Sequence, residues 1–148
     1  MGATRSLSGL SSGTDLAVEL ATMGMDLYTN PSPTGYAEKG DRWISSGQLL
    51  ARIRFIDRLL ASAPVAGGTQ INLLAQTQSR GLETAEGVVG YLLQLGLGPT
   101  VTKAQRVMGL NQLTKNGTRP YFSGADDAET RLRQLVKAIM ALPEYQYQ

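Results

Sequence analysis

The sequence predicts an all-α fold, an irregular bundle of five or six short helices with a long loop packed on the second helix. Apolar residues recur at helical spacing in several stretches, and capping residues, glycines or prolines bound these stretches. β-branched residues are scattered and never alternate with polar residues over the length of a strand. The chain has 148 residues, of which 42% are hydrophobic, so it is long enough to bury one core.

The chain begins with a glycine- and serine-rich stretch, residues 1–13, which predicts a flexible arm. A single helical domain is expected over residues 14–148. Thr14 and Asp15 can cap its first helix. The apolar face of that helix would carry Leu16, Leu20 and Met23.

Residues 26–42 are expected to form a long loop. Pro31, Pro33 and several glycines interrupt the hydrogen bonding that a regular element needs. The loop also contains Tyr28 and Tyr36, and a long loop with bulky aromatic side chains usually packs on a core. We therefore expect it to cover the helix that follows.

The second helix is predicted over residues 47–62. Ser45 or Ser46 is suited to the N-cap, and Gln48 fits as the capping-box partner of Ser45. Pro64 stops this helix, because the residue before a proline is disfavoured in helical conformation.

Four more helices are predicted over residues 69–79, 84–96, 100–116 and 126–143. Thr84 and either Thr100 or Thr102 are suited to N-caps, whereas Asn116-Gly117 and Pro143 mark helix ends. The apolar positions expected to face the core are Ile71, Leu74 and Ala75; Val88, Tyr91, Leu92 and Leu95; Val107, Leu110 and Leu113; and Leu132, Leu135, Val136 and Ile139.

Three glycines fall inside these predicted helices, namely Gly87, Gly90 and Gly109. Each costs about 1 kcal/mol relative to alanine. Either these helices are marginal, or neighbouring elements approach their backbone closely at these positions.

One arginine of the second predicted helix lies among its apolar positions. On a helical wheel at about 100° per residue, Arg52 falls between Leu59 and Ile56, whereas Arg54 and Arg58 fall on the opposite side. Burying a guanidinium without a partner costs many kcal/mol. We therefore expect Arg52 to lie at the edge of the core and to have a partner.

Arg52 is open to three interpretations. It can hold the preceding loop on the helix, with Asp26, Glu38, Asp41, backbone carbonyls or the tail near Glu144 as partners. It can bind a carboxylate or phosphate of a substrate, or it can extend its charged end to solvent. The first interpretation is the simplest.

Trp43 is the only tryptophan and directly precedes the second helix. It can anchor the first turn of that helix, or it can form a stacking platform for a sugar or base together with Tyr28 and Tyr36. The candidate residues for a structural or anion-binding site are therefore Arg52, Trp43, Tyr36 and Asp41.

No catalytic residue, metal site or cofactor is predicted. The sequence contains no cysteine and no histidine, and it lacks the motifs of serine hydrolases, phosphate-binding loops and zinc proteases. Two groups of carboxylates, Glu83 with Glu86 and Asp126-Asp127 with Glu129, lie at predicted helix N-termini, where capping and the helix dipole explain them. A site for a hard cation at the second group would need oxygen ligands from other segments.

Charge and hydropathy give little indication of a nucleic-acid or membrane partner. The net charge is +2, and no run of four basic residues occurs. Lys103, Arg106, Lys115 and Arg119 make one helix mildly basic, which we interpret as ordinary surface. No stretch of 18 apolar residues is present, so no transmembrane helix is expected. The sequence does not indicate which small-molecule ligand, if any, the protein binds.

Two stretches resemble the C-terminal part of the bacterial domain-of-unknown-function 1800 family. The family shows a pattern of Pro-x-x-Gly-Tyr followed by Trp-x-(Ser/Asn)-x-x-x-Leu-Leu-x-Arg. Within residues 27–60 this pattern corresponds to Pro31 or Pro33, Gly35, Tyr36, Trp43, Ser45, Leu49, Leu50 and Arg52. The family's terminal signature, Leu-x-(Ser/Leu)-Pro-Glu-(Phe/Tyr)-Gln, corresponds within residues 135–148 to Leu142, Pro143, Glu144, Tyr145 and Gln146.

The resemblance implies a largely α-helical protein, typically several times longer than this chain, often exported and without an established activity. We therefore expect a C-terminal fragment or a processed product. The hypothesis that follows is a non-enzymatic interaction or assembly module of an exported protein, acting through a protein partner or self-association. The alternative is a fragment of an enzyme that binds an anionic or carbohydrate substrate near Arg52, Tyr36 and Trp43.

Overall fold

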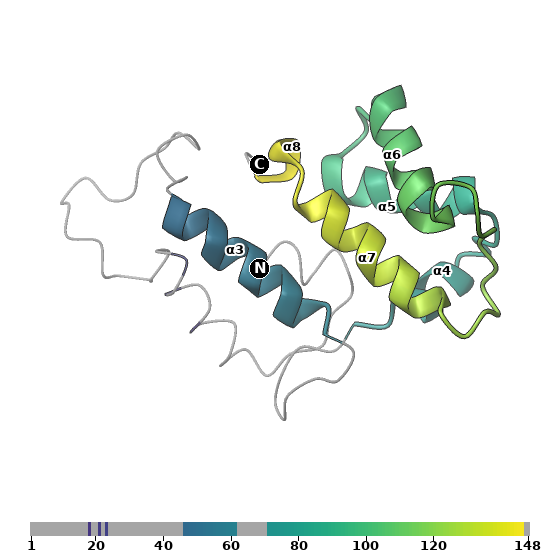
Figure 1. Ribbon diagram of the computed structural model, residues 1–148, viewed down its shortest axis with the longest axis horizontal. Helices are drawn as coiled ribbons and strands as arrows, with labels where there is room; N and C mark the ends of the chain where they lie inside the picture. The colour runs from purple at the N-terminus through teal and green to yellow at the C-terminus, as the bar shows by residue number, and fades with distance from the viewer. Residues whose placement is uncertain (1–17, 19–20, 22, 24–45, 62–70, 147–148) are drawn as a thin grey trace.

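The computed structural model describes residues 46–61 and 71–146, together with Val18, Ala21 and Met23 (Figure 1). These residues form six helices and no strand, which confirms the all-α prediction for this part of the chain. The helices are α3 (Ser46–Leu59), α4 (Leu73–Gln78), α5 (Ala85–Leu97), α6 (Lys103–Thr114), α7 (Ala128–Met140) and α8 (Pro143–Gln146). None of them has the length and hydrophobicity that a membrane-spanning helix requires.

Only three positions of the first predicted helix belong to the described residues. Val18 and Ala21 are helical, and Met23 is buried, as its place on the apolar face requires. The predicted arm over residues 1–13 and the long loop over residues 26–42 lie outside this description.

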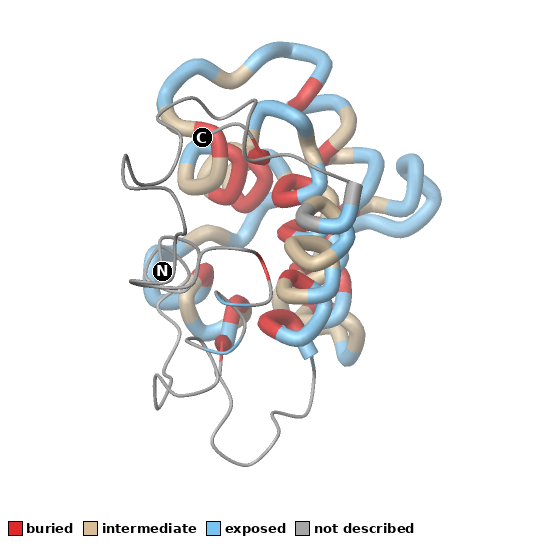
Figure 2. Tube along the Cα trace, turned by 90° about the vertical axis from the view of Figure 1, so that its left-hand side faces the viewer, coloured by how far each residue is buried: buried red, intermediate tan, exposed pale blue. Residues whose placement is uncertain are grey.

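Helix α7 is the centre of the bundle and packs against α3, α4, α5, α6 and α8. Figure 1 shows α7 with α3 along one side and with α5 and α6 on the other. Its four predicted core positions, Leu132, Leu135, Val136 and Ile139, are all buried. Figure 2 shows buried positions gathered where the helices face one another, and exposed positions along the outer turns and loops.

The helix ends follow the capping residues of the sequence. Thr84 accepts a hydrogen bond from the backbone N–H of Gly87 at 3.2 Å and so caps α5. Thr102 and Gln105 form a reciprocal capping box at the start of α6, with distances of 3.3 and 2.9 Å. After α6 the chain enters left-handed conformation at Lys115, Asn116 and Gly117, which confirms the predicted stop.

Helix α4 is shorter than predicted, because Asn72 rather than Thr69 begins it. The Asn72 side chain accepts a hydrogen bond from the Ala75 backbone N–H at 2.8 Å. Leu73 and Thr77 then face the core one turn apart, so Ala75 points outward and its predicted inward position is wrong.

Helix α6 presents a different face to the core than its apolar residues predict. The buried positions are Gln105, Gly109 and Leu113, spaced four residues apart. Val107, predicted to face inward, is 47% exposed. The backbone of Gly109 lies directly against α5, and this close approach sets the rotation of α6 about its axis.

Gly109 is the clearest case of a neighbour that approaches a helical glycine closely. A Cβ atom at this position would lie 2.7 Å from Cγ1 of Val89, whose side chain is almost fully buried. At Gly90 the nearest atom outside the helix backbone would be Nη1 of Arg106 at 3.6 Å, an ordinary contact. The two glycines therefore have different roles, although both lie inside helices.

Substitution of the two glycines by alanine is expected to change stability in opposite directions. Gly109→Ala should lower the free energy of unfolding by about 1–2 kcal/mol, because the clash with Val89 exceeds the gain in helix propensity. Gly90→Ala should raise it by up to about 1 kcal/mol. Urea denaturation of both variants measures the difference, and a stabilised Gly109→Ala variant would contradict the packing of α5 on α6.

Candidate functional site

Arg52 contacts the end of the chain. It lies on α3, is partly buried, and its Nη1 donates a hydrogen bond to the backbone carbonyl of Gln146 at 2.8 Å. Arg54, two residues further on, is exposed. The different environments of these two arginines agree with the helical wheel. Among the partners that the sequence left open, the structure brings Arg52 to a carbonyl of the tail.

The short helix α8 is held by three polar contacts from different elements. Arg52 on α3 supplies the first. Gln105 on α6 donates to Glu144 Oε1 at 3.0 Å, and the buried side chain of Gln146 donates to the Met140 carbonyl at 2.6 Å. Tyr145 packs against the core, and this burial raises the pKa of its hydroxyl. Pro143 therefore begins a helix tied to α3, α6 and α7, and does not merely end α7.

The contact of Arg52 with α8 joins the two stretches that carry the family resemblance. Arg52 ends the pattern found within residues 27–60, and Gln146 ends the terminal signature. Tyr36, Asp41 and Trp43 lie outside the described residues. Their predicted roles, in holding the loop or in binding an anion or a sugar, therefore stay predictions.

Removal of the Arg52 guanidinium is expected to loosen α8. Arg52→Gln should lower the free energy of unfolding by about 1 kcal/mol, because the charged hydrogen bond is partly exposed. It should also speed amide hydrogen exchange at Tyr145 and Gln146, whose N–H groups donate to the Leu142 carbonyl. Arg54→Gln is the matched control, since it removes an exposed arginine of the same helix. Equal exchange in the two variants would show that the Gln146 contact does not hold α8.

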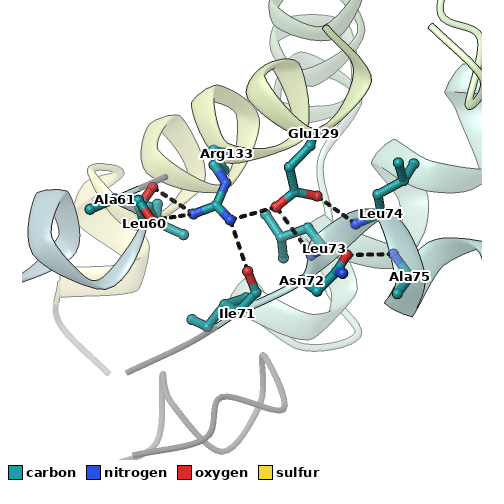
Figure 3. A network of polar contacts seen from close by, with 9 residues as sticks. All are labelled: Leu60, Ala61, Ile71, Asn72, Leu73, Leu74, Ala75, Glu129 and Arg133. Atoms are coloured by element: carbon teal, nitrogen blue, oxygen red, sulfur yellow. Dashed lines mark hydrogen bonds and ion pairs between the residues drawn. The ribbon is translucent and has the colours of Figure 1, made fainter. Parts of the chain in front are cut away.

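A second arginine joins three elements around α7 (Figure 3). Nη1 of Arg133 donates to the carbonyls of Leu60 and Ala61, each at 2.8 Å, directly after α3. Nη2 donates to the Ile71 carbonyl at 2.9 Å and pairs with Glu129 at 2.8 Å. One guanidinium thereby connects the end of α3 and the segment before α4 to α7.

Glu129, the carboxylate paired with Arg133, also accepts hydrogen bonds from the start of α4. Its Oε2 accepts a hydrogen bond from the Leu74 N–H at 2.7 Å, and Oε1 accepts a longer one from the Leu73 N–H at 3.4 Å. These are N–H groups of the first turn of α4, which have no acceptor within the helix. Glu129 therefore caps a neighbouring helix, and the helix dipole of α4 favours its negative charge.

Asp127 is the N-cap residue of α7, but its carboxylate does not cap that helix. Oδ2 instead accepts a hydrogen bond from Nε of Arg131 at 3.0 Å and pairs with Arg119 at 2.9 Å. The interpretation of Asp127 as a side-chain cap is thus wrong, because two guanidinium groups compete with the backbone N–H groups for this carboxylate. The hydrogen bond from Arg131, aided by the charge of Arg119, holds the pKa of Asp127 below its ordinary range.

Because the pKa of Asp127 is lowered, the free energy of unfolding depends on pH in the acidic range. The folded chain keeps Asp127 ionised at pH values where the unfolded chain binds a proton. The stabilisation from ionised Asp127 is therefore fully present above the pKa that this residue has in the unfolded chain. It is lost as the pH falls through the lower pKa that Asp127 has in the folded chain. We expect the urea midpoint to fall more steeply below about pH 4 in the unmodified chain than in Asp127→Asn. Parallel curves would contradict this role.

The described residues contain no group of three or more histidine, cysteine, aspartate or glutamate side chains placed to hold a metal ion. Asp127 and Glu129 bind arginines on different sides of α7. Glu86 lies in the first turn of α5, whereas Thr84 supplies the side-chain cap there.

The outer side of α6 carries an open hollow of about 720 Å³. The described residues that line it come from α6 and from the turn after it: Lys103, Ala104, Val107, Met108, Asn111, Gln112 and Asn116. Most of these side chains are uncharged, and the largest exposed apolar one is Val107. The described lining thus combines apolar side chains with amide groups.

The fold and these contacts define a small all-α domain in which arginines and carboxylates tie helix ends together. The sequence model of the family described as Protein of unknown function (DUF1800) matches residues 1–147, so the chain belongs to this family. The match confirms the resemblance that two short stretches indicated. No curated protein and no solved structure matches the chain.

Proposed function

We propose that this chain is a non-enzymatic helical module that acts by binding a protein partner or by self-association. The observation that carries the proposal is the outer side of α6, where Val107 is 47% exposed beside a hollow lined mostly by uncharged side chains. Val107 lies next to Ala104 and Met108, and an apolar group that stays exposed beside a hollow provides a place where a partner can bury it.

The use of the charged groups supports the same proposal. Arg131 and Arg133 donate to backbone carbonyls and to carboxylates of their own chain, so these cations stabilise the fold. The whole sequence lacks histidine and cysteine, the residues that most often supply a general base or a thiolate nucleophile. Export and a bacterial source are further parts of the proposal and rest on the family resemblance alone.

A measurement of the protein's mass after cross-linking in its native source tests whether it binds other protein subunits. The protein is fixed with a cross-linker in intact cells, isolated, and its mass compared with that of the unfixed, denatured chain. We expect a defined increase in mass, equal to one or more further protein subunits. A fixed protein with the mass of a single chain would overturn the proposal.

A further inference from the structure

The outer side of α6 combines an apolar centre with basic ends. Ala104, Val107 and Met108 follow one another at helical spacing along this side. Lys103 lies at one end of the helix and Lys115 directly after the other, and both are exposed. A helix of this length spans about 18 Å, so the two cations stand about three turns apart.

The charge around this surface has one sign over a long stretch of sequence. Residues 87–125 contain Lys103, Arg106, Lys115 and Arg119 but no aspartate or glutamate. Arg119 is paired with Asp127. For Lys103 and Arg106, no ion pair is formed within the part of the chain that the structure describes. Lys103 and Arg106 therefore offer positive charge that no carboxylate of the described residues pairs with, whereas the charge of Lys115 also acts on Asp127.

We propose that the outer side of α6 binds an acidic amphipathic helix of a partner protein. The inference rests on the proposed interaction function and adds its surface and the chemistry of its partner. The apolar side of the partner helix would cover Val107 and Met108, and its carboxylates would lie near Lys103 and Lys115. Apolar contacts at the centre supply affinity, whereas charge pairs at the rim set orientation and the rate of encounter.

The same surface is poorly suited to a nucleic acid. Phosphate recognition depends on several cations that follow the backbone, and apolar side chains contribute little to it. Here Val107 and Met108 occupy the centre between two separated lysines. Charge complementarity together with an apolar centre therefore favours an acidic protein helix.

Site-specific photo-cross-linking in the native cells tests this surface. A photoreactive amino acid replaces Val107 in one variant of the protein and Arg54, exposed on α3, in a control. We expect the Val107 variant to cross-link one partner segment with net negative charge and apolar residues at helical spacing, and the control not to do so. Products with nucleic acid, with a second copy of this chain or with a basic segment would overturn the inference.

Two further outcomes separate this inference from the proposed function. Cross-linking of a protein at Arg54 but not at Val107 leaves the interaction function in place and overturns the α6 surface. If neither position cross-links a protein, the proposed α6 surface is contradicted. If the fixed protein also has the mass of a single chain, the proposed interaction function is contradicted as well.

The captured segment, made as a peptide, gives the quantitative test. Val107→Asn should raise its Kd roughly tenfold, since it removes an apolar contact at the centre of the surface. Lys103→Gln should raise it about two- to fourfold, mainly by slowing association, since it removes one exposed charge at the rim. Arg54→Gln, which removes the same charge from α3, should leave the Kd unchanged. Equal effects of Lys103→Gln and Arg54→Gln on the Kd would show that binding depends only on the net charge of the protein. That result would overturn the proposal that the outer side of α6 is the binding surface.

Discussion

Replacement of Arg131 by methionine is expected to lower the free energy of unfolding by about 3–5 kcal/mol. The Arg131 residue is only 2% exposed. Its Nη1 donates to the backbone carbonyls of Arg119 and Pro120 at 3.2 and 3.1 Å, and its Nε donates to Asp127 at 3.0 Å. Methionine fills much of the same volume but donates no hydrogen bond, so these acceptors lose their partner.

Urea denaturation followed by circular dichroism measures this effect. The midpoint should fall while the slope m stays constant, because the fold and the surface exposed on unfolding are unchanged. Arg54→Met, on the exposed side of α3, is the control and should change stability by less than about 0.5 kcal/mol. A loss below about 1 kcal/mol for Arg131→Met would contradict the role of this guanidinium in joining α7 to the loop after α6.

The sequence contains a signal for Arg131, and it is the same signal that places Arg52. Arg131 lies three residues after Ala128 and four before Leu135, so a helical wheel puts it on the buried side of α7. An arginine among core positions requires acceptors, and this argument applies to both helices. The identity of the acceptors is different, because loop carbonyls such as those of Arg119 and Pro120 have no sequence pattern.

Arg133 shows where prediction from sequence ends. Its acceptors Leu60, Ala61 and Ile71 lie 73, 72 and 62 residues away along the chain. All three are backbone carbonyls, which every residue possesses, so no residue type marks them as partners. Such contacts follow only from the packing of α3 and α4 on α7.

The prediction that Val107 faces the core is wrong because packing between helices, which the sequence pattern does not show, places α6. Helix α6 has apolar residues on more than one side, and its buried side includes Gly109, which hydrophobic spacing does not count. The helix is placed by the close approach of its backbone to Val89 of α5. Helix ends are easier to predict, since the side chains of Thr84 and Thr102 accept hydrogen bonds from N–H groups only three residues away.

Replacement of Arg133 by methionine is expected to loosen α3 and to lower the free energy of unfolding by about 3 kcal/mol. Arg133 is partly buried and supplies donors to Leu60, Ala61 and Ile71, so methionine removes the guanidinium bonds of three carbonyls. The ion pair between Lys137 and Asp57 then remains as a polar contact between α7 and α3. Amide hydrogen exchange should therefore accelerate in α3 more than in α5 or α6.

Two variants separate the geometry of this guanidinium from its charge. Arg133→Lys keeps the positive charge but lacks the planar fork that reaches carbonyls on two sides, so it should recover only part of the lost stability. Glu129→Gln keeps an oxygen acceptor for the Leu74 N–H and removes the ion pair, so its effect should be smaller than that of Arg133→Met. Full recovery in Arg133→Lys would mean that charge alone holds α3 against α7. Equal acceleration of exchange in α3, α5 and α6 would mean that Arg133 does not hold α3 against α7.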